Sequence, residues 1–209
     1  MSMSRVIELA EELIAEAKKE HEGCACGCRN GLVQLSELNP GELFDIPEIG
    51  EIKVLEHFAN GTTAVIQNNF WEDGVQFDDD SCDYKTSELA DKFEDEIKPA
   101  YENAFGDALV EHEVILKSVD MRDYGKFSCK VRPITFDEAR KYNDLLVNKD
   151  LPGLWWTCTP WSTKLRGWKY SVAVVSPSGD IRNGRCNGSF GVRPFCILKS
   201  NIFVSKVEE

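Results

Sequence analysis

The chain has 209 residues, of which 42% are apolar and 29% charged, as expected for a soluble globular protein with one large domain or one domain and a small appendage. Its longest apolar stretches, such as 172–175, are far shorter than the roughly 20 residues that span a bilayer. We therefore expect no transmembrane helix and no membrane partner. No apolar signal segment follows Met1, which favours a cytoplasmic or virion-associated protein.

Charge is distributed unevenly along the chain, whose net charge is −12. Residues 1–130 contain 12 Lys/Arg against 29 Asp/Glu, a net charge of −17, whereas residues 131–209 contain 12 against 7, a net charge of +5. General nucleic-acid binding is not expected, because phosphate neutralisation needs a basic footprint. The basic residues between Trp161 and Lys199 either form a local binding patch or dock on the acidic part of the same chain.

The first 30 residues predict an amphipathic helix followed by a Cys/Gly-rich turn. Ser4 is a suitable N-cap, and one apolar stripe follows it: Val6, Ile7, Ala10, Leu13, Ile14 and Ala17. An isolated helix of this length is marginal in water, so it needs a partner surface. That surface belongs either to the same chain or to a second copy, which leaves a homo-oligomer through this helix open.

The turn that follows holds a candidate metal site formed by His21, Cys24, Cys26 and Cys28. Thiolates and imidazole are the ligands that zinc prefers. Zinc knuckles use two spaced Cys-x-x-Cys-type pairs, however, and the Cys-x-Cys-x-Cys spacing here does not supply them, so the alternative is a flexible turn after the helix. No other cofactor is expected.

Apolar residues alternate with polar ones over three segments, 42–46, 51–58 and 62–67, which predicts strands. Asn60-Gly61 predicts a type I′ hairpin, in which both central residues have positive φ. Four acidic residues then follow, Asp78, Asp79, Asp80 and Asp83. They lack the glycine and distal glutamate of an EF-hand, so we expect a solvated acidic turn before a helix.

Helical periodicity returns at Ser87, an N-cap residue, and continues to about Ala108, with Pro99 expected to kink or divide the helix. A capping box at Thr135 and Glu138 predicts a second helix to about Val147. The remaining segments predict short strands with turns between them: 110–116, 131–134, 154–158, 171–176, 181–183 and 192–204. This order predicts an α+β fold with two to three helices.

Three segments together resemble a known family: Val131–Tyr142 (VRPITFDEARKY), Trp155–Thr163 (WWTCTPWST) and Gly191–Leu198 (GVRPFCIL). The set is similar to a domain-of-unknown-function family of bacterial and prophage-encoded proteins, especially of Clostridia. Its closing pattern also resembles the end of C-type-lectin-like folds, including phage tropism determinants and sulfatase-modifying enzymes. The resemblance implies a C-type-lectin-like domain over residues 31–209, and a binding role more than an enzymatic one.

Two tryptophans and one arginine in these segments are expected to be structural. Trp155 and Trp156 are neighbours in a predicted strand, so their side chains point to opposite faces. Arg193 precedes Pro194, which favours an extended backbone, and its guanidinium is expected to bind a buried carboxylate or loop carbonyls.

The candidate ligand-binding site lies in two C-terminal loops. Aromatic faces beside cationic groups stack on sugars or other rings and hold acidic groups, and loops on a rigid scaffold commonly carry binding. The alternative is a loop packed on its own domain. The candidate residues are Trp161, Arg166, Trp168, Lys169, Tyr170, Arg182, Asn183, Arg185 and Asn187.

These features lead to three hypotheses about the function of the protein. The first is a non-catalytic recognition domain, phage- or prophage-encoded, that contacts a protein or glycan. The second is an acidic inhibitor-type protein that binds a basic surface of a host nuclease or defence complex. The third is a thiol- or metal-dependent enzyme, although the common catalytic motifs are missing and His57 and His112 look like ordinary strand residues. Calcium-lectin signatures are missing too.

Overall fold

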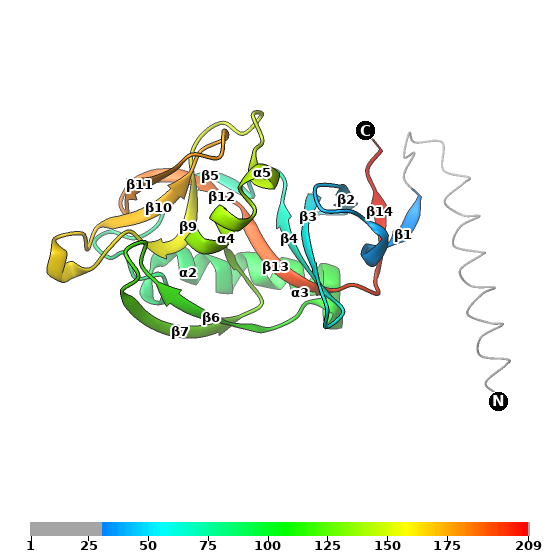
Figure 1. Cartoon of the computed structure of the whole chain (residues 1–209), viewed down its shortest axis with the longest axis horizontal. Coiled ribbons are helices and arrows are strands. Elements are labelled where there is room, and N and C mark those ends of the chain that lie inside the picture. Colours follow the sequence, from blue (N-terminus) through cyan, green and yellow to red (C-terminus); the bar gives the residue numbers. More distant parts are fainter. Residues whose placement is uncertain (1–30, 209) are drawn as a thin grey trace, which may run out of the picture. The chain divides into compact units, whose positions relative to one another are not determined.

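Strands dominate residues 31–208, the part of the chain that the computed structural model describes (Figure 1). The largest sheet is antiparallel, with the strand order β1-β14-β2-β3-β4-β13-β8. Its strands are β1 (Leu32–Gln34), β14 (Phe203–Lys206), β2 (Leu43–Ile46), β3 (Gly50–Phe58), β4 (Thr62–Gln67), β13 (Pro194–Lys199) and β8 (Val131–Pro133). The strand nearest the start of this region thus pairs with the last one, since Leu32 lies opposite Ser205.

Two smaller sheets complete the β structure. One has five strands in the order β11-β10-β9-β12-β5, in which only β12 and β9 run parallel. Its strands are β11 (Ile181–Arg185), β10 (Ser171–Val175), β9 (Trp155–Pro160), β12 (Ser189–Val192) and β5 (Glu72–Gln76). The other is a hairpin of β6 (His112–Lys117) and β7 (Asp123–Cys129).

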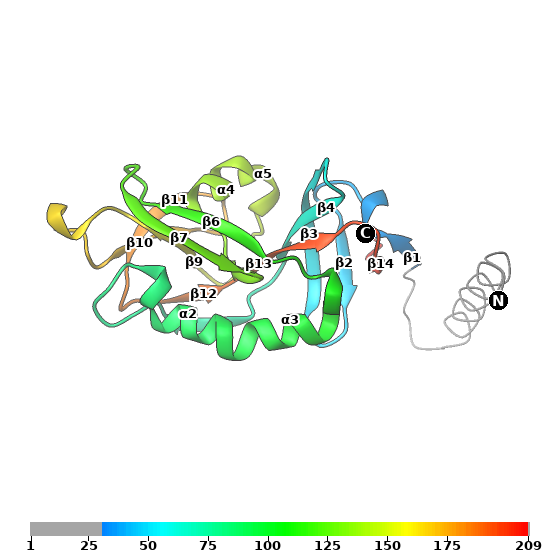
Figure 2. The ribbon, with the colours of Figure 1, turned by 90° about the horizontal axis from the view of Figure 1, so that it is seen from below.

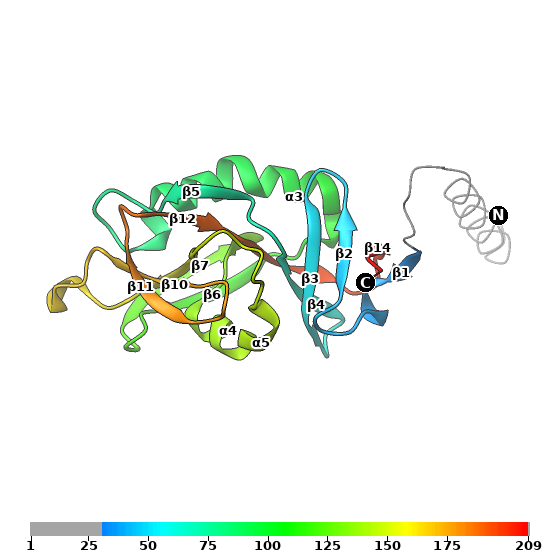
Figure 3. The ribbon, with the colours of Figure 1, turned by 90° about the horizontal axis from the view of Figure 1, so that it is seen from above.

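Helices lie on two sides of these strands (Figures 2 and 3). One long helical segment consists of α2 (Glu88–Lys92), the π-helical turn η3 (Phe93–Ile97), α3 (Lys98–Phe105) and the short turn η4 (Gly106–Ala108). The short helices α4 (Phe136–Lys141) and α5 (Asn143–Leu146) lie on the other side. The predicted α+β class is therefore confirmed, while the predicted N-terminal helix and Cys cluster lie outside the described residues.

The long helix starts where its cap predicts and changes its hydrogen bonding just before Pro99. Ser87 Oγ accepts a hydrogen bond from Ala90 N at 3.1 Å. In the π-helical turn, Lys98 N donates to Phe93 O, five residues back. Proline has no N–H to continue the α-helical pattern, and the wider turn accommodates it without ending the helix.

Replacing Ser87 by alanine is expected to destabilise the domain by about 1 kcal/mol, because the cap of this helix is lost. The Ser87 hydroxyl is buried and also donates to Tyr84 O at 2.9 Å, so the substitution removes two side-chain hydrogen bonds, while Tyr84 O and Ala90 N keep their bonds to the backbone of residue 87. Urea unfolding of the wild type and the variant measures the change. The exposed Ser36, changed to alanine, is the control and should stay within about 0.5 kcal/mol; equal stability of all three proteins would contradict the capping role.

The β3–β4 hairpin forms where predicted but with a different turn. Phe58 pairs with Thr62, which leaves three residues in the loop, and Gly61 N donates to Phe58 O at 3.1 Å. Gly61 has a φ of +78°, whereas Asn60 is not among the residues with positive φ. The predicted type I′ turn is therefore wrong, because the extra residue gives a type I turn closed by a left-handed glycine.

Two hydrophobic cores lie on the two faces of β9. Trp156 belongs to the larger core, and its Nε1 donates to Val75 O at 2.8 Å. Trp155 belongs to the smaller core, together with Ile66 and Leu146. Both tryptophans are fully buried, which confirms that they point to opposite faces and are structural.

Candidate functional site

The loop 161–170, which projects between β9 and β10 at one end of the domain (yellow in Figure 1), carries three exposed large apolar side chains. Leu165 is 99% exposed, and Trp168 and Tyr170 are 41% and 43% exposed. Met121, in the turn of the β6–β7 hairpin, is 62% exposed. We call Met121, Leu165, Trp168 and Tyr170 the apolar tip.

Hydrogen bonds hold this loop against the β6–β7 turn. Tyr124 Oη donates to Ser162 O at 2.6 Å, and Ser162 Oγ donates to Asp120 Oδ2 at 2.8 Å. Arg166 Nη1 lies 3.2 Å from the same Asp120 oxygen. Hydrogen bonds from Ser118 and Ser162, together with the charge of Arg166, lower the pKa of Asp120. The carboxylate therefore stays charged and fixes the base of the loop.

The end of β11 joins the same surface. Ser171 pairs with Arg185, and Cys186 N donates to Tyr170 O at 2.7 Å, so the exposed Arg185 and Asn187 lie beside the end of the loop. Three other candidates are placed differently. Trp161 is partly buried at the base of the loop, Asn183 is exposed farther along β11, and Arg182 pairs its guanidinium with Asp180 at 3.1 Å, away from the tip.

A cavity of about 280 Å³ opens next to the loop. Its lining residues are Asp80, Ser81, Cys82, Asp83, Tyr124 and Lys169. Lys169 is the only lining residue that also belongs to the candidate ligand-binding residues of the two C-terminal loops. Its Nζ lies 4.1 Å from the centre of the Tyr170 ring. The cavity therefore brings the acidic turn before the long helix to the base of the apolar tip.

The acidic turn is held by its own backbone. Asp78 Oδ1 accepts hydrogen bonds from Asp80 N at 2.9 Å and Ser81 N at 2.8 Å, and Asp78 is only 9% exposed. The prediction of a solvated turn thus fails for Asp78 and holds for the exposed Asp79 and Asp80, because one carboxylate must turn inward to bind the backbone. Within residues 31–208, no group of three or more His, Cys, Asp or Glu side chains is arranged to hold a metal ion.

The cysteines of the described region bear on the thiol-enzyme hypothesis. Cys82, Cys129, Cys158, Cys186 and Cys196 are free and buried. Burial raises the pKa of Cys129 to about 11 and that of Cys158 to about 12. These side chains are thiols at neutral pH and not the thiolates that nucleophilic chemistry needs.

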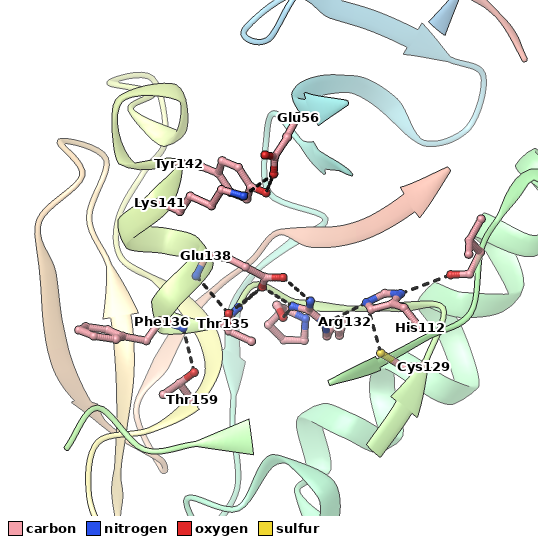
Figure 4. A network of polar contacts seen from close by, with 12 residues as sticks. Glu56, His112, Cys129, Arg132, Thr135, Phe136, Glu138, Lys141, Tyr142 and Thr159 are labelled. Carbon is pink, nitrogen blue, oxygen red and sulfur yellow. Dashed lines mark hydrogen bonds and ion pairs between the residues drawn. The ribbon is translucent and has the colours of Figure 1, made fainter. Parts of the chain in front are cut away.

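One of these thiols does contact a histidine. Cys129 Sγ lies 4.0 Å from His112 Nε2, and the same nitrogen accepts a hydrogen bond from Arg132 Nε at 3.2 Å (Figure 4). Burial and the charge of Arg132 lower the pKa of His112 to about 4. The neutral imidazole of His112 uses Nε2 to accept the hydrogen bond from Arg132. The Cys129–His112 pair therefore lacks the activated base of a Cys–His catalytic unit. His57 is structural too, bonding Leu38 O and Thr63 Oγ1.

Arg132 forms a buried fork with Glu138 that sequence reasoning missed (Figure 4). Arg132 Nη1 and Nη2 donate to the two Glu138 oxygens at 2.8 and 2.6 Å, and Thr135 N donates to Glu138 Oε2 at 2.8 Å. Burial would raise the pKa of Glu138, but Arg132 and Thr135 outweigh it and lower the pKa to about 2. The capping box predicted from sequence is confirmed, and its glutamate also neutralises the strand arginine.

Comparisons with known proteins do not assign a function to these residues. No family model, no curated protein and no solved structure matches the chain. No helix in residues 31–208 is long and apolar enough to cross a membrane. The candidate metal ligands His21, Cys24, Cys26 and Cys28 lie outside this range.

Proposed function

We propose that this domain is a non-catalytic recognition module whose apolar tip contacts a protein partner. The observation that carries the proposal is the exposure of Leu165, Trp168 and Tyr170 on one loop that is anchored at its base. Exposed apolar side chains gathered at one place mark interaction sites in soluble proteins. Anchoring limits the conformational entropy that the loop loses on binding, which favours affinity.

The residue types favour a protein over a glycan. Tyrosine, tryptophan, methionine and arginine are enriched in the cores of protein interfaces, and Trp168, Tyr170, Met121 and Arg166 supply all four. A fully exposed leucine adds apolar surface that a sugar hydroxyl would not complement. A glycan ligand remains the alternative that the binding experiment decides.

A C-type-lectin-like fold and a phage or prophage origin are part of the same proposal. The motif resemblance implies a C-type-lectin-like domain from a phage or prophage, in which turns on a rigid scaffold serve for contact. The long helix, the short antiparallel strands and the loops at one end support it. We infer a cytoplasmic or virion-associated location from the same resemblance.

Changing Leu165 and Trp168 together to aspartate is expected to remove partner binding without changing the melting temperature. Each side chain is exposed in the free domain, whereas interface hot spots contribute about 2 kcal/mol or more, or about 30-fold in affinity. Affinity capture from host lysate, followed by quantification of the captured protein, measures the effect. The control is Phe203→Asp, which changes an exposed apolar residue on β14.

Three outcomes of that capture are decisive. Loss of capture in the double variant alone supports the apolar tip. Equal capture by all three proteins contradicts it. Capture of a glycan that the double variant also loses would keep the surface and replace the class of partner.

The acidic inhibitor is a second candidate, supported by the long helix. Residues 88–108 contain seven Asp/Glu against two Lys, and the two lysines are already paired with Glu72, Glu94 and Glu96. A basic partner surface would complement this helix. Binding should then weaken steeply with salt and respond to Asp91→Asn/Asp95→Asn; binding that is equal at low and high ionic strength contradicts this candidate.

A further inference from the structure

Arg193 occupies a buried position where the two larger sheets meet the short helices. It lies between β12 and β13, and its guanidinium carbon is 4.8 Å from the centre of the Trp155 ring. Arg193 Nε donates to Gln67 O at 3.0 Å, and Nη1 donates to Leu146 O at 3.1 Å. The acceptors are backbone carbonyls, as expected, but they belong to the last residues of β4 and α5 and not to loops, so the arginine joins β4, α5 and β9.

Two donors on these stacked side chains have no protein acceptor. Within residues 31–208, Arg193 Nη2 and Trp155 Nε1 are buried and unpaired. Both residues are fully buried. Leaving a buried donor without an acceptor costs about 1–3 kcal/mol, and more for a charged group, so native proteins nearly always supply one.

The cluster also has more positive charge than the neighbouring residues balance. No ion pair joins Arg193 to a carboxylate in the described part of the chain; its acceptors are neutral carbonyls. Lys53 is nearby and donates to Leu145 O at 3.2 Å. Burial and the charge of Arg193 lower the pKa of Lys53 against the opposing charge of Glu51, and burial lowers the pKa of Arg193 to about 9. Arg193 therefore remains a cation at neutral pH.

We propose that Arg193 Nη2 and Trp155 Nε1 bind a small monovalent inorganic anion of halide size. One such ion accepts both hydrogen bonds and neutralises the guanidinium, which reduces the large cost of burying a charge. A water molecule would satisfy the donors but leave the charge. The site is structural and independent of the apolar tip.

Crystals grown from protein that has been exchanged for a long time into bromide test the site directly. Because both residues are fully buried, the ion enters through local opening of the domain, and exchange is slow. The expected result is an anomalous bromine peak within hydrogen-bonding distance of both nitrogens. Ordinary water density without an anomalous peak would overturn the proposal, as would a side-chain rearrangement that pairs both donors.

A solution experiment uses the two neighbouring tryptophans as a matched pair. Trp155→Phe removes one of the proposed anion ligands, whereas Trp156→Phe removes an indole that donates to Val75 O. Melting temperatures are measured in sodium bromide and in sodium gluconate at equal ionic strength. We expect bromide to stabilise the wild type and Trp156→Phe, and to stabilise Trp155→Phe less; equal shifts in all three would contradict an anion at Trp155.

Discussion

Replacing Glu138 by alanine is expected to destabilise the domain by about 3–5 kcal/mol. The change leaves Arg132, which is 2% exposed, without its negative partner, and a buried unpaired charge is far more costly than the loss of a surface ion pair. It also removes the acceptor of Thr135 N at the start of α4. Urea unfolding at neutral pH measures the free energy of unfolding.

Two further variants separate the unpaired charge from the loss of the cap. Glu138→Gln keeps an acceptor for Thr135 and Arg132 but lacks the charge, so its loss of stability should be intermediate. Arg132→Met combined with Glu138→Leu removes both charges and should be less destabilised than Glu138→Ala alone. A Glu138→Ala protein within about 1 kcal/mol of the wild type would show that Arg132 finds another partner.

Acid is expected to destabilise the domain by up to about 3 kcal/mol between pH 6.5 and 4, through His112. Burial, then the charge of Arg132, lowers the pKa of His112 from 6.5 to about 4. In this window the unfolded chain binds a proton at His112 and the native domain does not, so the free energy of unfolding falls as the pH falls. Each unit of pKa difference corresponds to about 1.4 kcal/mol.

The pH dependence of unfolding is measured for the wild type and for His112→Gln, which retains an acceptor for Arg132 Nε. The variant should lose much of the slope between pH 6.5 and 4. Glu138 acts in a separate window, because its lowered pKa of about 2 gives stability that is lost only as the pH falls from about 4.5 to 2. An unchanged slope in His112→Gln would show that His112 is protonated in the native domain.

Local signals in the sequence predict much of this fold. Apolar alternation within residues 51–58 gives β3, the short β-branched run of residues 62–67 gives β4, and the caps Ser87 and Thr135 begin helices, because these features depend on neighbours in the chain. The strands β5 and β7 were not predicted. Their polar, largely exposed residues show no apolar alternation, and they form because β12 and β6 offer edges to pair with.

The candidate site, like the fold, could be predicted only where the signal lies in neighbouring residues of the sequence. The aromatic and basic composition of residues 161–170 indicates a binding loop, whereas nothing near Met121 in the sequence indicates that it lies beside this loop. The link is the bond from Ser162 to Asp120, which joins residues 42 positions apart. The fork between Arg132 and Glu138 was missed for another reason, since a capping box by itself explains the glutamate.

Photo-cross-linking at position 165 tests the central claim most directly. A photoreactive amino acid replaces Leu165 in one protein and Phe203 in another, since both side chains are exposed and neither is needed for packing. If the apolar tip contacts the partner, the protein labelled at 165 forms a covalent adduct with it in lysate, and the protein labelled at 203 does not. Adducts from position 203 with none from position 165 would contradict the account.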